Sequence, residues 1–330
     1  MNKRLAIVLI YALPLPVLAI SLFIGPSTQV GPMDLWRHLT GGADPTQAAV
    51  IEAILFDVRL PRILLVFMVG GVLSISGSAL QAVFRNPLVS PYVLGLSSGA
   101  AFGAALALAT PFLPVSLSAF VFGLAAIGLS YFLAQKRKTL SVVSLILAGI
   151  IVNGIFTALL TIVQYISDPF KLQSIVLWTM GNFQNANWEK LRASVIPVIL
   201  GVSVLLLFRW RLNVLALGDD EARSVGVDPV RNKNVVLLVV SLASSAAVAT
   251  AGIISLYGLM IPHIVRMIAG VDNRVTLPLN FFFGGMFLLV IDNISRSVTD
   301  FEIPIGIFTM LLGAPFFIYL MKKNNVGWQQ

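Results

Sequence analysis

Residues that could carry covalent chemistry are scarce in this sequence. Its 330 residues include no cysteine and only two histidines, His38 and His263. Without cysteine there is no thiol nucleophile, disulfide or thiolate metal site, and two isolated histidines do not supply a His-rich metal site. No G-x-x-x-x-G-K-[ST] loop or other nucleotide-binding fingerprint occurs. We therefore expect no catalytic residues, no metal and no cofactor in this chain, and we do not expect an enzyme.

The composition points to a lipid solvent. Apolar residues make up 58% of the chain and charged residues 11%, against roughly 45–50% and about 25% in soluble domains. With a mean hydropathy of +0.93, the chain has too little polar surface to cover a water-soluble globule. These values exclude a soluble enzyme and a DNA-binding protein, so the net charge of +8 indicates topology and not a nucleic-acid partner.

Apolar runs about as long as a membrane helix requires recur along the chain. They lie near 5–24, 63–84, 91–110, 115–134, 140–163, 193–208, 234–254, 279–297 and 305–321. A shorter tenth candidate, 256–270, carries Pro262, His263 and Arg266 and reaches only about 22 Å of the ~30 Å hydrocarbon core. Such a segment must be shielded by its neighbours or pair with irregular backbone inside the protein.

Charges at the two ends decide the number of crossings. Lys3 and Arg4 precede the first apolar run, and Lys322 and Lys323 follow the last. The positive-inside rule places both termini in the cytoplasm, which requires an even number of spans. We predict an all-α polytopic membrane protein of about ten helices, forming one transmembrane domain over residues 1–330. No A-x-A site follows the first run, which favours an uncleaved span over a signal peptide.

The predicted membrane interior is poor in ionisable residues. The runs around 91–110, 115–134 and 140–163 contain none. Proton relays are usually built from intramembrane Asp, Glu and His side chains, so coupling to a proton gradient has little support. Gly95, Gly99 and Gly103 form two G-x-x-x-G units, which indicate tight helix packing or, alternatively, a smooth wall for a bulky solute.

The longest inner loop, Arg209–Asn234, has a specific pattern. Asp219, Asp220 and Glu221 stand where negative charge suits the start of a short helix, and Gly226 ends that helix. Asp228-Pro229 is typical of an N-cap and first turn, opening another short helix or the next span. Such a loop forms either a docking surface beneath the bilayer or an interfacial helix without a partner.

The outer loops are richer in aromatic and amide residues. Residues 25–62 include an amphipathic segment, Thr46–Asp57, followed by Arg59-Leu60-Pro61-Arg62 at the mouth of the second span. Residues 164–191 contain Tyr165, Trp178 and Trp188, which we interpret as an interfacial aromatic belt.

Several runs together resemble the FecCD-type permeases, the membrane subunits of ABC importers for ferric siderophores, heme and vitamin B12. The runs are RLPRILLVFMVGGVLSISGSALQAVFRNPLVSPYVLGLSSGAAFGA (59–104), LILAG (145–149), LWTMGN (177–182), GDDEARSVGV (218–227), AGIISLYGLMIPHIVRMIAGVDNRVTLP (251–278) and EIPIGIFTMLLGAPFFIYLM (302–321). The resemblance covers nearly the whole chain after the first span.

The resemblance implies an architecture like that of the vitamin B12 permease. That architecture has ten spans, with inverted-repeat halves at roughly spans two to five and seven to ten. It also implies a homodimer with the pathway at its centre, two ATPase subunits that carry ATP and Mg, and an extracytoplasmic substrate-binding protein. The expected location is the cytoplasmic (inner) membrane of a bacterium or archaeon.

Matching positions carry roles over from the family. The coupling helices that dock on the ATPase match about 212–230, with the residues Gly218, Asp219, Asp220, Glu221, Ala222, Arg223 and Gly226. Arg59, Arg62 and Arg296 match arginines that receive carboxylates of the binding protein, although pairing with Asp57, Asp292 or Asp300, or snorkelling, is the alternative. One cytoplasmic gate matches Asn86 and Leu88. The second matches Val142 and Val143, where the vitamin B12 permease has small hydroxyl residues.

We interpret the chain as the permease of an ATP-driven importer for a ferric siderophore or similar iron chelate. Vitamin B12, heme or an oxyanion such as molybdate are the alternative cargoes, and the lining is rather neutral for a small anion. A gradient-driven secondary transporter is a rival of another class, disfavoured by the missing intramembrane carboxylates. A membrane enzyme is a third, for which no nucleophile–base or metal constellation is present.

Overall fold

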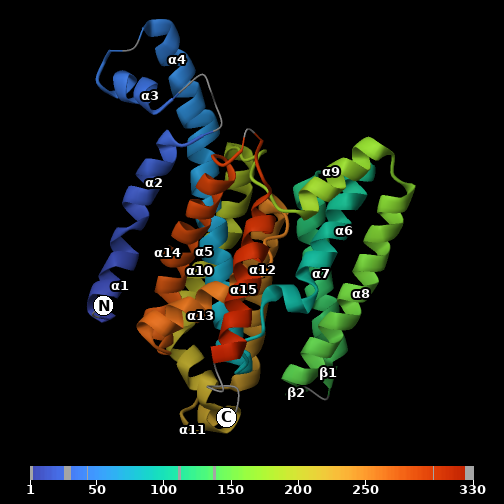
Figure 1. The fold of residues 1–330 in the computed structure, drawn as a ribbon. Coiled ribbons are helices and arrows are strands. Elements are labelled where there is room, and N and C mark those ends of the chain that lie inside the picture. Colours follow the sequence, from blue (N-terminus) through green and yellow to red (C-terminus); the bar gives the residue numbers. More distant parts are fainter. Residues whose placement is uncertain are drawn as a thin grey trace.

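The computed structural model describes residues 3–25, 31–42, 44–110, 113–136, 139–299 and 301–323. Within these ranges the chain is helical except for turns and one antiparallel pair of two-residue strands, β1 (Gln135–Lys136) and β2 (Thr139–Leu140). The predicted all-α architecture is confirmed. The helices run roughly parallel to one long axis, with α11 at one end and α9 near the other (Figure 1).

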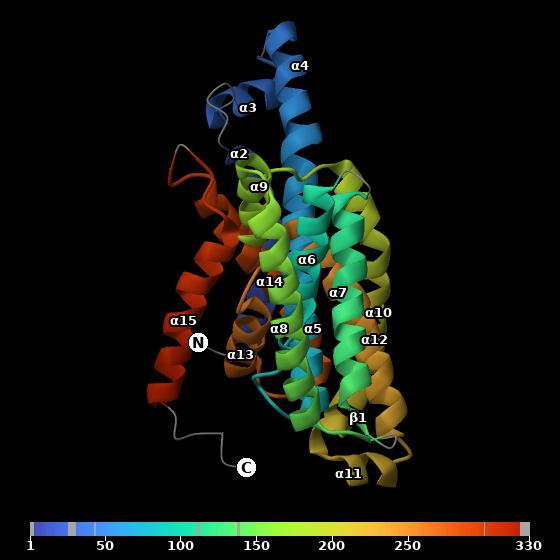
Figure 2. The same cartoon turned by 90° about the vertical axis from the view of Figure 1, so that its right-hand side faces the viewer.

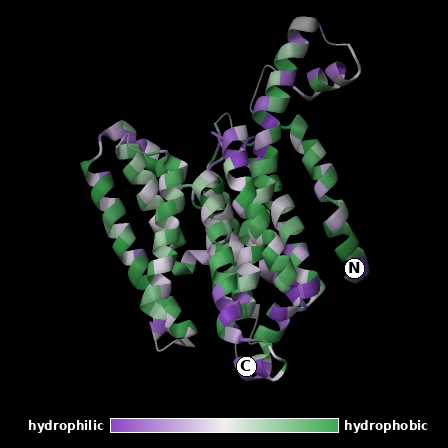
Figure 3. Cartoon of the chain, turned by 180° about the vertical axis from the view of Figure 1, so that it is seen from behind, coloured by the Kyte–Doolittle hydropathy of each residue, from purple (hydrophilic) through white to green (hydrophobic). Residues whose placement is uncertain are grey.

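Eight helical stretches in the described residues are long and apolar enough to cross a membrane. They are α1 (Lys3–Ala12) with α2 (Pro14–Phe23), α5 (Leu60–Phe84), α7 (Val115–Ala134), α8 (Val142–Ile166), α10 (Trp188–Leu217), α12 (Pro229–Ala251), α14 (Asn273–Ser295) and α15 (Ile305–Lys323). Two shorter apolar helices, α6 (Leu96–Ala109) and α13 (Tyr257–Ala269), bring the total to the predicted ten. Apolar residues follow these helices along their length, and polar residues gather toward the ends of the bundle (Figure 3).

Two halves of the chain repeat one order of elements. In the first, the long α5 is followed by an irregular stretch, the single 3-10 turn η2 (Pro91–Leu94), the short α6 and the long α7 and α8. In the second, the long α12 is followed by residues 252–256, the short α13 and the long α14 and α15. Because α5 runs toward the α11 end and α12 runs away from it (Figure 1), the halves have opposite orientation, as predicted.

Three predicted boundaries are wrong. The third span begins at Leu96 and not near 91, because Pro91–Leu94 forms η2 and Gly95 has a φ of 92°. Helix α4 (Pro45–Ala53) continues through the π-helical η1 (Ile54–Arg59) into α5, so that one continuous helix includes Gln47–Phe84. The short α3 (Pro32–Leu39) lies with α4 beyond the end of the bundle (Figure 2). Helix α10 extends to Leu217, which shortens the predicted inner loop.

Helix α5 is the core of the bundle. In its most apolar window 83% of the residues are buried, and it packs against α10, α12, α13 and α14. A Cβ on Gly77 would lie 1.8 Å from the carbonyl oxygen of Gly258, and one on Gly70 would lie 2.5 Å from that of Gly284. The small residues therefore let α13 and α14 approach the α5 backbone directly, as in membrane helix pairs generally.

Candidate functional site

The predicted coupling segment forms one short helix, α11 (Asp219–Ser224), at the end of the bundle. Its C-terminus is a Schellman motif, because the N–H of Val227 donates to the carbonyl of Ala222 (2.8 Å) and that of Gly226 to the carbonyl of Arg223 (3.0 Å). Gly226 has a φ of 79°, which favours glycine. Asp228 then caps α12 by accepting from the N–H groups of Val230 and Arg231. Of the two alternatives for Asp228-Pro229, the start of the next span is therefore the correct one.

Helix α11 is fixed on one side and open on the other. Asp219 bonds Lys233 of α12 at 2.6 Å, and Ala222 is fully buried. On the open side Asp220 and Arg223 form an exposed ion pair at 3.0 Å, and Val225 is 56% exposed. Leu217, at the end of α10, is 71% exposed. We call these four residues the α11 surface, which presents paired charges beside apolar side chains.

The predicted gate residues lie toward the same end of the bundle. Asn86 follows the end of α5 and accepts a hydrogen bond from the N–H of Leu88 at 2.9 Å, and Leu88 is 45% exposed. Val142 and Val143 form the start of α8, and Val143 is 66% exposed. Their role as gates stays a prediction.

The three arginines predicted to receive the binding protein are buried. Arg59 and Arg296 are 3% exposed and Arg62 is 6% exposed. Arg62 bonds Asp292 at 2.8 Å and Glu302 at 2.7 Å, and Arg296 lies 3.1 Å from the other oxygen of Asp292. These side chains are not exposed charges on this chain, because the ionic cluster of Arg62, Arg296, Asp292 and Glu302 is enclosed by α5, α14 and the segment before α15. Their docking role stays a prediction.

The arginines of this region also hold the end of the first span in place through hydrogen bonds. Arg59 donates to the carbonyl of Leu22 at 2.8 Å and Arg296 to that of Ile24 at 2.9 Å. These carbonyls end α2, where cations are favoured by the helix dipole. Of the predicted alternatives, pairing with Asp292 is present, whereas Asp300 lies outside the described residues.

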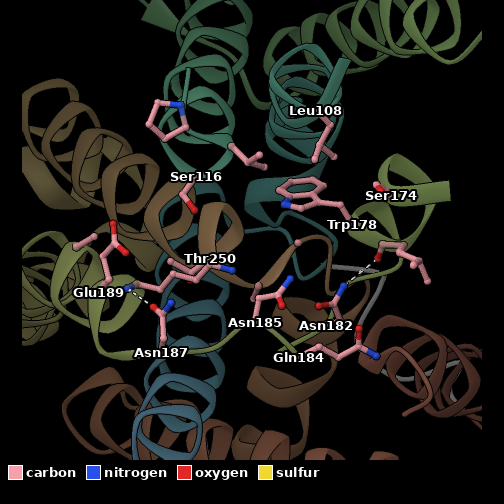
Figure 4. Close-up of a pocket in the computed structure, with 17 residues that line it drawn as sticks. Leu108, Ser116, Ser174, Trp178, Asn182, Gln184, Asn185, Asn187, Glu189 and Thr250 are labelled. Carbon is pink, nitrogen blue, oxygen red and sulfur yellow. Dashed lines mark hydrogen bonds between the residues drawn. The ribbon is translucent and has the colours of Figure 1, made fainter. Parts of the chain in front are cut away.

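A polar cavity of about 680 Å³ opens at the α9 end of the bundle, between α7, α9 (Pro169–Thr179), α10 and α12. Figure 4 shows the amides of Asn182, Gln184 and Asn185 and the indole of Trp178 around it, with Ser116 and Thr250 across from them. Glu189 and Lys190 add one charge of each sign. The polar groups of the wall are therefore mostly neutral donors and acceptors, set among apolar side chains such as Leu108 and Leu177. From the sequence we interpret the aromatic residues of this stretch as an interfacial belt, whereas the structure places its amides over 182–187 and Trp178 in the wall of this cavity.

The two histidines, both within the described ranges, do not form a metal site in the structure. Among the described residues there is no group of three or more His, Cys, Asp or Glu side chains that could hold a metal ion. His38 lies 3.7 Å from Glu52 beyond the bundle, and the ring of His263 packs edge-on against Phe316.

Comparison with known proteins gives consistent matches. The family model of the FecCD transport family matches residues 12–323. The molybdate import system permease protein MolB of Haemophilus influenzae is 41% identical over 306 residues, covering 91% of this chain and 89% of that protein. The hemin transport system permease protein HmuU of Yersinia pestis is 38% identical, covering 82% and 84%. The solved structure of a metal-chelate type ABC transporter in an inward-facing conformation matches with a TM-score of 0.85 and 38% identity, covering 97% and 100%.

Proposed function

This chain belongs to the FecCD transport family and is a permease subunit of an ABC importer, and from that premise we propose that it carries an iron chelate into the cytoplasm. In this proposal two copies form the pathway, a separate ATPase dimer supplies the energy, and a substrate-binding protein delivers the cargo. The chain supplies the route and the coupling surface and performs no covalent chemistry.

The proposal for the pathway rests on the exposed faces of α8 and α15, which are uncharged. Only 28% of the most apolar window of each helix is buried, and neither Val142–Ile166 nor Ile305–Met321 contains Asp, Glu, Lys, Arg or His. Exposed side chains on α8 include Val143, Leu147 and Ile151. A second copy placed against these faces would enclose a wide apolar passage, which suits a bulky chelate whose charge is already shielded.

Molybdate is the second candidate cargo. The similarity to the Haemophilus influenzae molybdate permease favours it, whereas the uncharged faces of α8 and α15 favour the chelate. Uptake into proteoliposomes that contain the permease, its ATPase and the loaded binding protein separates the two. We expect ATP-dependent accumulation of a ferric siderophore. Accumulation of molybdate with no siderophore uptake would refute the chelate and leave the importer function intact.

The α11 surface is the proposed contact for the ATPase. A cross-link is a direct test, since no native cysteine competes with an introduced one. Ser224→Cys, on the exposed side of α11, should form a bismaleimide cross-link to a cysteine introduced on the membrane-facing side of the ATPase. Lys171→Cys on α9 is the matched control at the opposite end of the bundle (Figure 1). Cross-linking at position 171 and not at 224 would refute the assignment.

A functional variant complements the cross-link. Val225→Arg places a charge on an exposed position, so the fold should survive while ATP hydrolysis and uptake become uncoupled. Ala222 is a poor choice for the same test, because it is fully buried and a bulky side chain there would disturb α11 itself. Unchanged coupling in a well-inserted Val225→Arg protein would contradict the proposed contact.

A further inference from the structure

A small basic pocket lies at the α11 end of the bundle, apart from the α11 surface. It has a volume of about 200 Å³ and lies between the end of α5, the loop that follows it, the end of α10 and the last turn of α13. Its polar lining residues are Ser78, Gln81, Arg85, Asn86, Arg266 and Asn273. The lining therefore contains two arginines, three amides and a hydroxyl, and no carboxylate.

Arg266 is the central group of this pocket. Its Nη2 donates to Oε1 of Gln81 at 2.6 Å, and the Nε2 of Gln81 donates in turn to the carbonyl of Gly258 at 3.4 Å. This chain of bonds fixes the amide so that its oxygen faces the guanidinium. No carboxylate in the described part of the chain lies within ion-pair distance of Arg266. A guanidinium has five N–H donors in a planar fork, of which the Gln81 bond uses one.

The acidic residues nearby along the chain are engaged elsewhere. Asp272 caps α14 by accepting from the N–H of Arg274 at 2.9 Å and also accepts from Asn213 at 2.6 Å. Asp219 is bonded to Lys233. Glu221 and Arg85 both approach the same point beside Gly218, so a carboxylate lies near Arg85, although no ion pair joins the two among the described residues. Arg266 is left as a partly buried cation with a neutral partner.

We propose that this pocket binds an oxyanion, a phosphate or a tetrahedral oxyanion of similar size, held by Arg266 and by the amides of Asn86 and Asn273. Guanidinium groups match oxyanions through paired N–H···O bonds, and an anion would supply the charge that the protein does not. The volume equals the share of about six or seven water molecules in the liquid, which leaves room for the ion and some hydration. The ion is either free in solution or the phosphate of a lipid headgroup.

The site would connect the predicted gate after α5 with the α11 surface. Asn86 is a predicted gate residue, and Ala216 of α10, which also lines the pocket, lies just before α11. A bound anion would bridge the loop after α5 to α13 and thus stiffen the junction between the predicted gate and the α11 surface.

The potential in the pocket can be measured with charged thiol reagents. Val271→Cys places a single thiol at an exposed lining position that is not one of the proposed ligands. Its reaction rates with an anionic and a cationic methanethiosulfonate are compared at fixed ionic strength in nanodiscs of phosphatidylcholine. We expect the anionic reagent to react several-fold faster and this preference to fall with Arg266→Gln but not with Arg266→Lys. Arg231→Gln, an exposed arginine on α12, is the matched control and should leave the ratio unchanged.

Protection experiments identify the anion. Slower labelling by inorganic phosphate or molybdate at millimolar concentration, relative to chloride, would support a site for free oxyanions. Protection that appears only in nanodiscs containing phosphatidylglycerol would support a headgroup site. The proposal is overturned if the two reagents react alike, or if neither anion nor lipid protects the thiol. Since Arg266→Gln could disturb folding, the ratio is also measured with Arg85→Gln, which should lower it less.

Discussion

Asp292 is the residue on which the ionic cluster depends. It is fully buried, and it is the shared partner of Arg62 and Arg296. Replacing it with asparagine keeps the shape and removes the charge. Arg62 retains Glu302 at 2.7 Å, but Arg296 is left with a carbonyl and the amide of Asn293. Removing one member of a buried ion pair typically costs about 3–5 kcal/mol, because the remaining charge is uncompensated.

Equilibrium unfolding in mixed micelles with increasing sodium dodecyl sulfate measures this cost. We expect Asp292→Asn to lower the free energy of unfolding by about 3–5 kcal/mol. Asp220→Asn breaks the exposed pair on α11 and should cost about 1 kcal/mol or less. Adding Arg296→Gln to Asp292→Asn should recover part of the loss, because the unpaired charge is then removed as well. A cost for Asp292→Asn no larger than that of the control would refute the structural role.

The same cluster decides how the docking prediction must be tested. Reversing Arg59 and Arg296 to glutamate would place acids in a buried site beside Asp292, so slower capture of the binding protein could follow from misfolding alone. The informative variants are those whose unfolding free energy matches that of the wild type. If such a variant of Arg59 captures the binding protein at the wild-type rate at low salt, the docking role is wrong.

Three further outcomes follow from single positions. Gly77→Ala should lower the free energy of unfolding by more than about 3 kcal/mol, which exceeds ordinary overpacking, because the new Cβ meets the backbone of Gly258. Gly128→Ala is its control: nothing lies within 4 Å of a Cβ there, so the free energy of unfolding should stay the same or rise. Gly226→Ala should cost about 1–2 kcal/mol from its left-handed backbone, seen as faster proteolysis at α11. Hydrogen bonds to Asp168, first that from the backbone N–H of Lys171, lower the pKa of its carboxyl. This contribution to α9 is present above the usual aspartate pKa and is lost as the pH falls through the lowered value. The protection factors of the first-turn amides, which are exchange rates corrected for their intrinsic pH dependence, should therefore fall over that range and should not change with pH in Asp168→Ala.

The spans could be predicted because lipid imposes a simple length and polarity rule. The ten apolar helices follow from local composition, and capping indicates that some helix begins at Asp228-Pro229. The continuous helix from Gln47 to Phe84 was not predicted: the amphipathic segment Thr46–Asp57 and the second span were expected as separate elements, and Pro61 lies where they join. Proline is tolerated in the first turn of α5, and the π-helical turn η1 before it accommodates the absence of the backbone hydrogen bond that Pro61 cannot donate. No local sequence rule predicts such a π-helical turn.

The arrangement of the candidate site was less predictable. The α11 helix follows from its acidic first turn and glycine stop, whereas the burial of Arg62 depends on Asp292, which is 230 positions away in the sequence. The polar cavity likewise combines loop 182–187 with the ends of α7 and α12. Contacts of this kind between distant residues are set by the three-dimensional packing of the bundle, and local patterns in a single sequence do not predict them.

The central position of α5 has a consequence for the making of the protein. Its polar groups find their partners late in the chain: Ser74 bonds Asn280 and Gln81 bonds Arg266. At roughly 5–20 residues per second, a ribosome needs on the order of 10–40 s to go from the end of α5 to the start of α14. During that interval a helix designed for burial stands in the membrane without its neighbours. Its small residues and hydroxyls must then be sheltered by the insertion machinery or by the early helices. Correct assembly therefore requires that α5 stays protected from the lipid until the second half of the chain has been made.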